Sequence, residues 1–135
     1  MIRQLNDLNK GTFTGNLGIK FLDAGNGFIE ASMPVEDKLQ PMGYLHGGAS
    51  LALAETVASC GSYLLVDPEK YSIFGLQVSG NHITTISEGM LFARADVVHR
   101  GHSTHVWDVT IRSENGKLIS VVRVTIMVMK KKSQS

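Results

Sequence analysis

Residues 40–59 read QPMGYLHGGASLALAETVAS, and this stretch sets a single carboxylate within a long apolar segment. From Gly48 to Leu65 the chain consists mainly of Ala, Leu, Val, Ser and Gly, which predicts a buried helix. Glu55 is the only charged residue of this helix. A carboxylate is rarely buried without a partner, because its desolvation is costly. We therefore expect Glu55 to face a cleft or an interface rather than a sealed core.

The glycines before this helix predict a site for a carbonyl group. The first N–H groups of a helix have no intrahelical partner and carry the positive end of the helix dipole. Gly47 and Gly48 lack a Cβ atom, so a substrate carbonyl could approach their N–H groups closely. A carbonyl polariser combined with a carboxylate is suited to acyl-transfer chemistry.

The spacing between these groups predicts a dimer. Gly47 and Glu55 are eight residues apart, which is about 12 Å along a helix. A reacting carbon lies about 3 Å from both its polarising donors and its attacking group. If both groups act on one carbon, they must therefore come from different copies of the chain. We expect a two-fold dimer with two equivalent sites, each combining the helix start of one subunit with Glu55 of the other.

Alternating apolar residues predict an antiparallel sheet that curls around the helix. In residues 104–113, Trp107, Val109 and Ile111 alternate with Asp and Thr, which is the period of a strand with one buried face. Short turns join the runs of this kind, four of which follow the helix. The predicted strands span residues 16–22, 28–33, 72–82, 90–99, 104–113 and 117–129.

These elements form a single domain of the α+β class over residues 1–135. Residues 1–14 are an N-terminal extension with a weak helical pattern, and residues 130–135 are a basic tail that we expect to be disordered. The pair Asn115-Gly116 predicts a type I′ hairpin turn. Cys60 is expected to be a buried packing group, because a single cysteine cannot form an internal disulfide.

Composition and charge argue against several classes of protein. A formal net charge of +1 argues against a nucleic-acid binder held by phosphate contacts. No stretch approaches the roughly 18 apolar residues that a membrane span needs, and no signal peptide is evident, so we expect a cytoplasmic protein. His99, His102 and His105 do not predict a metal site, because residues three apart in a strand point to opposite faces.

The run from Gln40 to Ser50, followed by Ala54, Glu55 and Ser59, resembles the acyl-CoA thioesterases of the hotdog fold. In that fold an antiparallel sheet curls around one long helix. The pattern is most similar to the subgroup that acts on aromatic acyl groups, which includes 4-hydroxybenzoyl-CoA and 1,4-dihydroxy-2-naphthoyl-CoA hydrolases and the enterobactin proofreading thioesterase. The resemblance extends from about residue 15 to residue 129.

The resemblance implies a role for each residue of this motif. Glu55 would be the nucleophile or the general base, and the Gly47 N–H would polarise the thioester carbonyl. His46 and Gln40 would hold the thioester or the catalytic water. Ser59 would help to position the water or the leaving group, and it shares a helix face with Glu55 because the two are four residues apart.

Two segments in the later strands are also similar to the family. Asn81 and His82 fall where members of the subgroup place a residue near the acyl group. A turn in the second half of the chain falls where they contact the pantetheine and nucleotide parts of CoA. His99 and His105 flank this turn, and we expect them near the CoA phosphates or in a solvated loop. The turn consists of Arg100, Gly101, His102 and Ser103.

Each of these residues also has a purely structural interpretation. Glu55 could pair with an arginine or lysine elsewhere in the chain, and His46 could cap the helix or bind a loop carbonyl. Gln40 could be a solvated loop residue. Ser59 could hydrogen-bond a carbonyl one turn back, as serines in helices often do. The sequence leaves these alternatives open.

The resemblance implies an acyl-CoA substrate and no cofactor other than the CoA that the substrate carries. It also implies dimers that pair into a homotetramer. Three other functions stay open. They are a noncatalytic acyl-CoA-binding protein, a hotdog-fold dehydratase, which would use an Asp or His pair, and a purely structural oligomer. The lysines at 130–132 either are solvated or screen the CoA phosphates.

Overall fold

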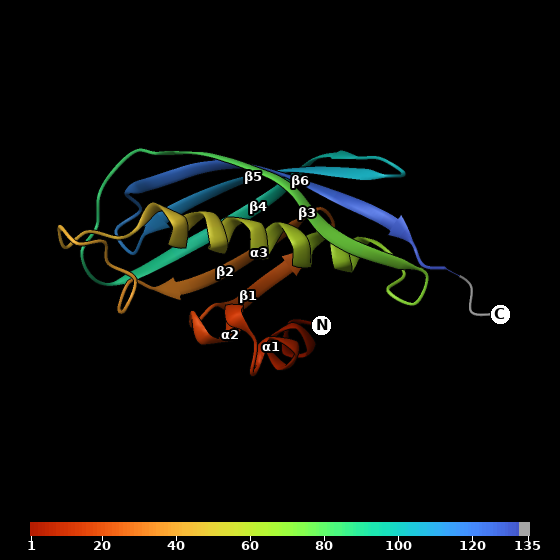
Figure 1. Ribbon diagram of the computed structural model, residues 1–135, viewed down its shortest axis with the longest axis horizontal. Helices are drawn as coiled ribbons and strands as arrows, with labels where there is room; N and C mark the ends of the chain where they lie inside the picture. Colours follow the sequence, from red (N-terminus) through yellow and green to blue (C-terminus); the bar gives the residue numbers. More distant parts are fainter. Residues whose placement is uncertain (133–135) are drawn as a thin grey trace.

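The computed structural model describes residues 1–132 and contains one antiparallel sheet wrapped around a long helix (Figure 1). This helix, α3, spans Gly47–Leu65, and together with the sheet it confirms the predicted α+β class. The strand order is β1-β2-β4-β5-β6-β3, so β1 and β3 are the two edges. No helix in residues 1–132 has the length and hydropathy needed to cross a membrane. The strands are β1 (Lys20–Gly25), β2 (Phe28–Pro34), β3 (Tyr71–His82), β4 (Met90–Arg100), β5 (Thr104–Ser113) and β6 (Leu118–Lys130).

The predicted strand at residues 16–22 is wrong in its first half. Residues Phe13–Asn16 form a short helix, α2, and the side chain of its N-cap residue Thr12 accepts a hydrogen bond from the Gly15 N–H. Gly18 then has a φ of +78°, which lies outside the range of a strand, and β1 begins only after it. A helix cap and a left-handed glycine therefore outweighed the apolar pattern.

The other five predicted strands are confirmed to within one residue at each end. The predicted type I′ turn between β5 and β6 is wrong, because Gly116 has a φ of +83° whereas Asn115 does not have a positive φ. The Gly116 N–H donates to the Ser113 carbonyl over 2.9 Å. This geometry is a type I turn followed by a left-handed glycine, the usual form of a three-residue hairpin loop.

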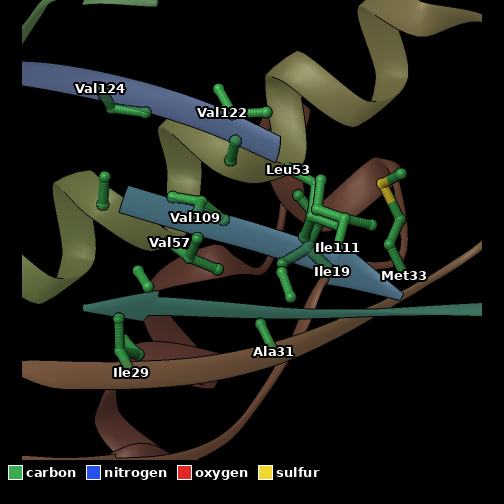
Figure 2. Packing of buried hydrophobic residues seen from close by; sticks show 14 of the residues in the cluster. Ile19, Ile29, Ala31, Met33, Leu53, Val57, Val109, Ile111, Val122 and Val124 are labelled. Atoms are coloured by element: carbon green, nitrogen blue, oxygen red, sulfur yellow. The ribbon is translucent and has the colours of Figure 1, made fainter. Parts of the chain in front are cut away.

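The core lies between α3 and the concave face of the sheet (Figure 2). In β5, Trp107, Val109 and Ile111 are buried, as their alternation predicts. Figure 2 shows Val109 and Ile111 next to Leu53 and Val57 of α3. Burial of one large aliphatic side chain contributes about 1.5–3 kcal/mol to folding. The apolar helix is therefore the element around which the strands close.

A buried polar cluster also joins α3 to β5. Ser62 Oγ accepts a hydrogen bond from Trp107 Nε1–H over 2.8 Å and lies 2.7 Å from His105 Nδ1. His105 is 2% exposed, and its burial and the nearby Arg100 and His99 lower its pKa. The structure therefore corrects the expectation that His105 lies near CoA phosphates or in a solvated loop, because the ring is part of the core.

Helix α1 (Ile2–Asn9) covers the β1 edge of the sheet, whereas exposed apolar side chains lie along the β3 edge. The side chain of Asn6, from this helix, accepts from the Phe21 N–H over 2.8 Å and donates to the Phe21 carbonyl over 3.1 Å. Asn6 thus binds edge strand β1 as a neighbouring strand would, and Figure 1 shows α1 beside β1. On the opposite edge, Phe74 and Leu76 of β3 are 49% and 58% exposed. Because an open edge strand can pair with another chain, β3 is the edge suited to association.

The predicted basic tail begins within the sheet. Lys130 is the last residue of β6 and pairs with Tyr71 of β3. The Lys131 N–H donates to the Lys70 carbonyl over 2.8 Å. Ladder pairing at the end of β6 therefore extends into the tail. Residues 133–135, the remainder of the predicted tail, lie outside the described residues.

Candidate active site

The two glycine N–H groups at the start of α3, which the sequence predicted to act together, differ in their hydrogen bonding. His46 is the N-cap residue, and its ring Nδ1 accepts a hydrogen bond from the Gly48 N–H over 2.8 Å. This bond places the proton of a neutral His46 ring on Nε2. Within residues 1–132 no hydrogen bond engages the Gly47 N–H, so Gly47 is the donor that can bind a ligand.

The loop before α3 uses the Gln40 side chain internally. Gln40 Oε1 accepts a hydrogen bond from the Met42 N–H, and the Gln40 N–H donates to the Tyr44 carbonyl over 2.7 Å. The Leu45 N–H donates to the Ile86 carbonyl over 2.7 Å, which ties this loop to the segment between β3 and β4. In this arrangement Gln40 supports its own turn, which is a structural role that the sequence left open.

Glu55 projects from the middle of α3 toward edge strand β3 and is exposed. A Cβ atom at Gly75 of β3 would lie 2.7 Å from Glu55 Oε1, so the missing side chain makes room for the carboxylate. The ladder between β3 and β6 has a register shift between Gly75 and Gln77, which marks a bulge at Leu76 beside Glu55. Within residues 1–132 Glu55 forms no ion pair. These features place the carboxylate at the surface of the protomer and not in a sealed core.

The side chains that follow Glu55 on the same helix are less exposed. Ser59, one turn later, is half-buried, as is Cys60. Burial raises the pKa of the Cys60 thiol to about 11, so the thiol is protonated at neutral pH. Because the thiolate is the reactive form of cysteine, Cys60 is a packing residue and not a nucleophile.

The end of β3 brings His82 to the start of α3. His82 Nδ1 lies 2.8 Å from Ser120 Oγ of β6, and a Cβ atom at Gly47 would lie 2.5 Å from His82 Nε2. Asn81 precedes His82 in the strand and therefore points to the other face of the sheet, where it lies in a pocket with Asp108. The structure thus places His82 at the candidate site and separates Asn81 from it.

The turn predicted to contact CoA lies at the other end of α3. Arg100 Nη2 donates to the carbonyl of Leu65, the last residue of the helix, over 2.7 Å. Gly47 and Leu65 are 18 residues apart, which is about 27 Å along a helix. The same turn continues through Gly101, His102 and Ser103, and the side chains of His102 and Ser103 are exposed. Within one protomer this turn is therefore remote from the helix start.

A pocket that the sequence did not predict lies beside the helix start. It has a volume of about 130 Å³, and Gly47 and His82 line it together with Ser50 and Ser120. Ser50 is 1% exposed, and its Oγ has no hydrogen-bond partner within residues 1–132. An unpaired buried hydroxyl costs about 1–3 kcal/mol. Ser50 belongs to the quoted motif, but no sequence signal indicates that its hydroxyl is unpaired, because the pairing depends on distant strands.

The arrangement provides the two components of acyl transfer at separate places. The Gly47 N–H at the positive end of α3 can polarise a carbonyl, and the Glu55 carboxylate can attack a carbon or deprotonate water. The two groups are about 12 Å apart along the same helix, so one protomer does not bring both to one carbon.

The chain is similar to known proteins along most of its length. Residues 42–120 match the family model described as the Thioesterase superfamily. A 1,4-dihydroxy-2-naphthoyl-CoA hydrolase from Listeria monocytogenes is 38% identical over 117 residues, which cover 86% of this chain and 94% of that protein. A protein of the same name from Escherichia coli is 35% identical over 129 residues, which cover 95% of this chain and 94% of that protein.

A solved structure of a mutant thioesterase from Pseudomonas aeruginosa has the same architecture. Its TM-score is 0.94 at 39% sequence identity, and the match covers 97% of this chain and 95% of that chain. The single sheet around one helix is thus the hotdog fold that the sequence resemblance implied. The chain therefore belongs to the thioesterase superfamily and is a thioesterase enzyme with the hotdog fold.

Proposed function

We propose that this thioesterase hydrolyses an aromatic or hydroxyaromatic acyl-CoA to the free acid and CoA. The observation that carries the proposal is the position of Glu55, an exposed carboxylate without an ion-pair partner in residues 1–132, beside the open edge strand β3. The aromatic acyl group is supported by the two relatives named 1,4-dihydroxy-2-naphthoyl-CoA hydrolase.

The active unit in this proposal is a two-fold dimer. Asn6 already binds the β1 edge, whereas β3 has exposed apolar side chains at its edge. Pairing of β3 with β3 of a second copy would extend the sheet and cover this edge. The two-fold axis would make the α3 helices of the two copies antiparallel. The helix start of one copy would then approach the middle of the partner's helix, where the partner carries its own carboxylate.

The reaction begins when the thioester carbonyl accepts a hydrogen bond from the Gly47 N–H. Glu55 of the partner copy then attacks the carbonyl carbon and expels the CoA thiolate, and water hydrolyses the resulting mixed anhydride. In the alternative route, Glu55 removes a proton from water, and the hydroxide attacks the carbonyl and expels the thiolate. The Nε2–H of His46 can donate to the thioester or to this water, and Ser59 contributes to holding the water. Neither route uses a metal or a cofactor.

We propose that the turn formed by residues 100–103 of one subunit binds the CoA whose thioester lies at the helix start of the other subunit. Antiparallel α3 helices would bring this turn of one copy toward the helix start of the other. We also propose that two dimers associate into a homotetramer in the cytoplasm, and a solution mass measurement of the purified protein tests the number of subunits.

Turnover of benzoyl-CoA, followed with a thiol-trapping dye, tests the activity and the role of Glu55. We expect the wild type to release CoA, and E55Q and E55A to lose turnover by orders of magnitude because they lack the attacking or basic carboxylate. E69Q removes another exposed glutamate, outside the site, and should keep wild-type turnover.

Three results would contradict the proposal. Full activity of E55Q would show that Glu55 has no chemical role. Tight binding of acyl-CoA by the wild type without thiol release would indicate a noncatalytic acyl-CoA-binding protein. Loss of water from a hydroxyacyl-CoA, again without thiol release, would indicate a dehydratase.

A further inference from the structure

The side chains of Ser120 and His82 form a pair between strands β6 and β3. The two residues lie opposite each other in the ladder of these strands, and Ser120 Oγ is 2.8 Å from His82 Nδ1. Ser120 is completely buried, and within residues 1–132 this is the only hydrogen bond of its hydroxyl. Ser120 has no role in the proposed reaction, although its partner lies at the candidate active site.

The burial of Ser120 determines which atom donates in this hydrogen bond. A serine hydroxyl has one hydrogen to donate and can accept through two lone pairs. A buried donor without an acceptor costs about 1–3 kcal/mol, so buried hydroxyl hydrogens are nearly always bonded. Because His82 Nδ1 is the one acceptor that Ser120 Oγ contacts within residues 1–132, the hydroxyl donates to Nδ1. A neutral His82 ring then carries its proton on Nε2.

The ring of His82 lies with its face against Gly47. A Cβ atom at Gly47 would lie 2.5 Å from Nε2, 2.8 Å from Cδ2 and 3.2 Å from Cε1 of this ring. Because the three distances are similar, the Cβ position is above the ring and not in line with the Nε2–H bond. That bond lies in the ring plane and is therefore not directed at Gly47. Since His82 is exposed in the protomer, this hydrogen is available to a ligand.

The N–H groups of Gly47 and His82 are close enough to bind one oxygen atom together. The Cβ position of a residue is about 2.5 Å from its own backbone nitrogen. Since His82 Nε2 is 2.5 Å from the Cβ position of Gly47, Nε2 and the Gly47 nitrogen are at most about 5 Å apart. An N–H donor lies about 2.9 Å from its acceptor, so two donors at this separation can share a carbonyl oxygen. Both residues also line the pocket of about 130 Å³ beside the helix start.

We infer that His82 is a second hydrogen-bond donor to the thioester carbonyl, and that Ser120 is the positioning residue that makes it one. This inference rests on the proposed function and adds two residues to its mechanism. Attack on the carbonyl carbon moves an electron pair onto the oxygen, and the Gly47 N–H and the His82 Nε2–H stabilise that negative charge. The electron pair returns when the carbon–sulfur bond breaks and the CoA thiolate leaves. His82 keeps its proton throughout.

Initial rates with benzoyl-CoA test the role of His82, because the ring of this substrate has no hydroxyl that His82 could bind instead. We expect H82A to lower kcat about 100-fold with little change in KM, since the loss of one donor to the developing charge has an effect of this size. S120A keeps the imidazole but removes the group that orients it, so kcat should fall about 3- to 10-fold. T125V removes a hydroxyl of the same strand outside the site and should keep the wild-type kcat.

Two further measurements separate positioning from a general loss of structure. Adding S120A to H82A should lower kcat no further, because Ser120 acts only through His82. Nitrogen NMR of the histidine rings at pH 8, where an imidazole is largely neutral, should show the His82 proton on Nε2. The signals are assigned by their absence in H82A, so this measurement does not depend on the folding of S120A. Melting temperatures verify that each variant is folded.

Three results would overturn the inference. A proton on Nδ1 of His82 would show that Ser120 accepts in the hydrogen bond. Unchanged kcat in H82A, with or without a higher KM, would show that His82 does not stabilise the developing charge. An effect of S120A that is equally large in the H82A background would assign Ser120 to the fold alone.

The same assay separates these results from a failure of the proposed function. If the wild type releases thiol in a manner that depends on Glu55, any of the three results leaves the thioesterase proposal intact and refutes only the roles of His82 and Ser120. If the wild type releases no thiol from any acyl-CoA, the proposed function fails, and the roles in catalysis given to His82 and Ser120 fail with it.

Discussion

At the scale of single residues, small side chains decide where the reactive groups lie. The His46 ring caps Gly48 and leaves the Gly47 N–H for a ligand, so two adjacent glycines have different roles. Gly75 has an equally local effect, since the Glu55 carboxylate occupies the space that a side chain at position 75 would fill. One missing Cβ atom on a neighbouring strand therefore sets the position of the proposed attacking group.

We predict that G75A impairs the chemical step while the fold is kept. The new Cβ atom would lie 2.7 Å from Glu55 Oε1, and the flexible carboxylate would move away from it. A displacement of about 1 Å in a reacting group lowers turnover by about 100-fold. We therefore expect kcat with benzoyl-CoA to fall between about 10- and 100-fold, with little change in KM, when initial rates are measured over a range of substrate concentrations.

The matched control for this prediction is the same substitution in the E55A enzyme. If Gly75 acts only by making room for Glu55, adding G75A to E55A should change residual activity no further. An unchanged kcat in the single G75A variant, with wild-type melting temperature, would show that the carboxylate does not need this space.

At the scale of elements, α3 is fixed to the sheet by apolar packing and by one buried polar cluster. Ser62 of the helix binds Trp107 and His105 of β5, and all three side chains are almost fully buried. A neutral His105 fits this cluster, because a charged ring would need to be desolvated close to Arg100 and His99. The junction between helix and strand is therefore sensitive to protonation.

We predict that the folded protein loses stability below about pH 6.5 through His105. Its pKa is lowered in the folded state, so between the unfolded and the folded pKa the unfolded chain binds a proton that the folded chain does not. Stability is thus fully present above the unfolded value and falls as the pH drops toward the folded one. One such group changes the free energy of unfolding by up to about 1.4 kcal/mol per pH unit.

Urea unfolding between pH 8 and pH 5, at constant protein concentration, measures this slope. H105Q should show a smaller decrease of unfolding free energy than the wild type, because its side chain does not titrate. H102Q removes an exposed histidine of the adjacent turn and should retain the wild-type slope. Identical slopes for the wild type and H105Q would assign the pH dependence to other groups.

At the scale of the whole molecule, the two edges of the sheet determine how copies of the chain would associate. Helix α1 covers β1 through Asn6, which satisfies the edge backbone at Phe21. The β3 edge carries exposed Phe74 and Leu76, and Glu55 lies next to it. The edge suited to pairing is thus also the edge that carries the proposed attacking group.

We predict that two inactive variants restore activity when their subunits are mixed. E55A lacks the carboxylate, and G47P lacks the N–H that polarises the carbonyl. Proline suits the first position of a helix, and His46 before it already has an extended conformation, with φ −67° and ψ 128°. The Cβ atom that proline adds would also displace the His82 ring of the same subunit, whose Nε2 lies 2.5 Å from that position. Random reassociation of equal amounts makes half of the dimers mixed, and each mixed dimer has one intact site, so about a quarter of wild-type activity should return.

This experiment requires denaturation and refolding of the two variants together, followed by the benzoyl-CoA assay. Each variant refolded alone is the control and should stay inactive. If the mixture is as inactive as its components, although mass measurement shows mixed dimers, then each site is built from a single protomer and the shared site is wrong.

The sequence by itself determined the elements of this protein. The apolar run around Glu55 predicted α3, and the two-residue alternation of residues 104–113 predicted β5, because both are periodic properties of neighbouring residues. The same strand period separates Asn81 from His82, although the sequence prediction had placed both near the acyl group. At residues 16–19 the end of a capped helix and a left-handed glycine replace the first half of a predicted strand.

The tertiary structure alone decided which groups of the motif are available to a substrate. The space for Glu55 at Gly75, and the contact between His82 and Gly47, join residues far apart in the chain. The unpaired state of Ser50 depends on everything that surrounds its hydroxyl, including the strands that end beside it. Periodicity reports which face of an element is buried, whereas free space and unpaired hydrogen-bonding groups arise only when separate elements pack together.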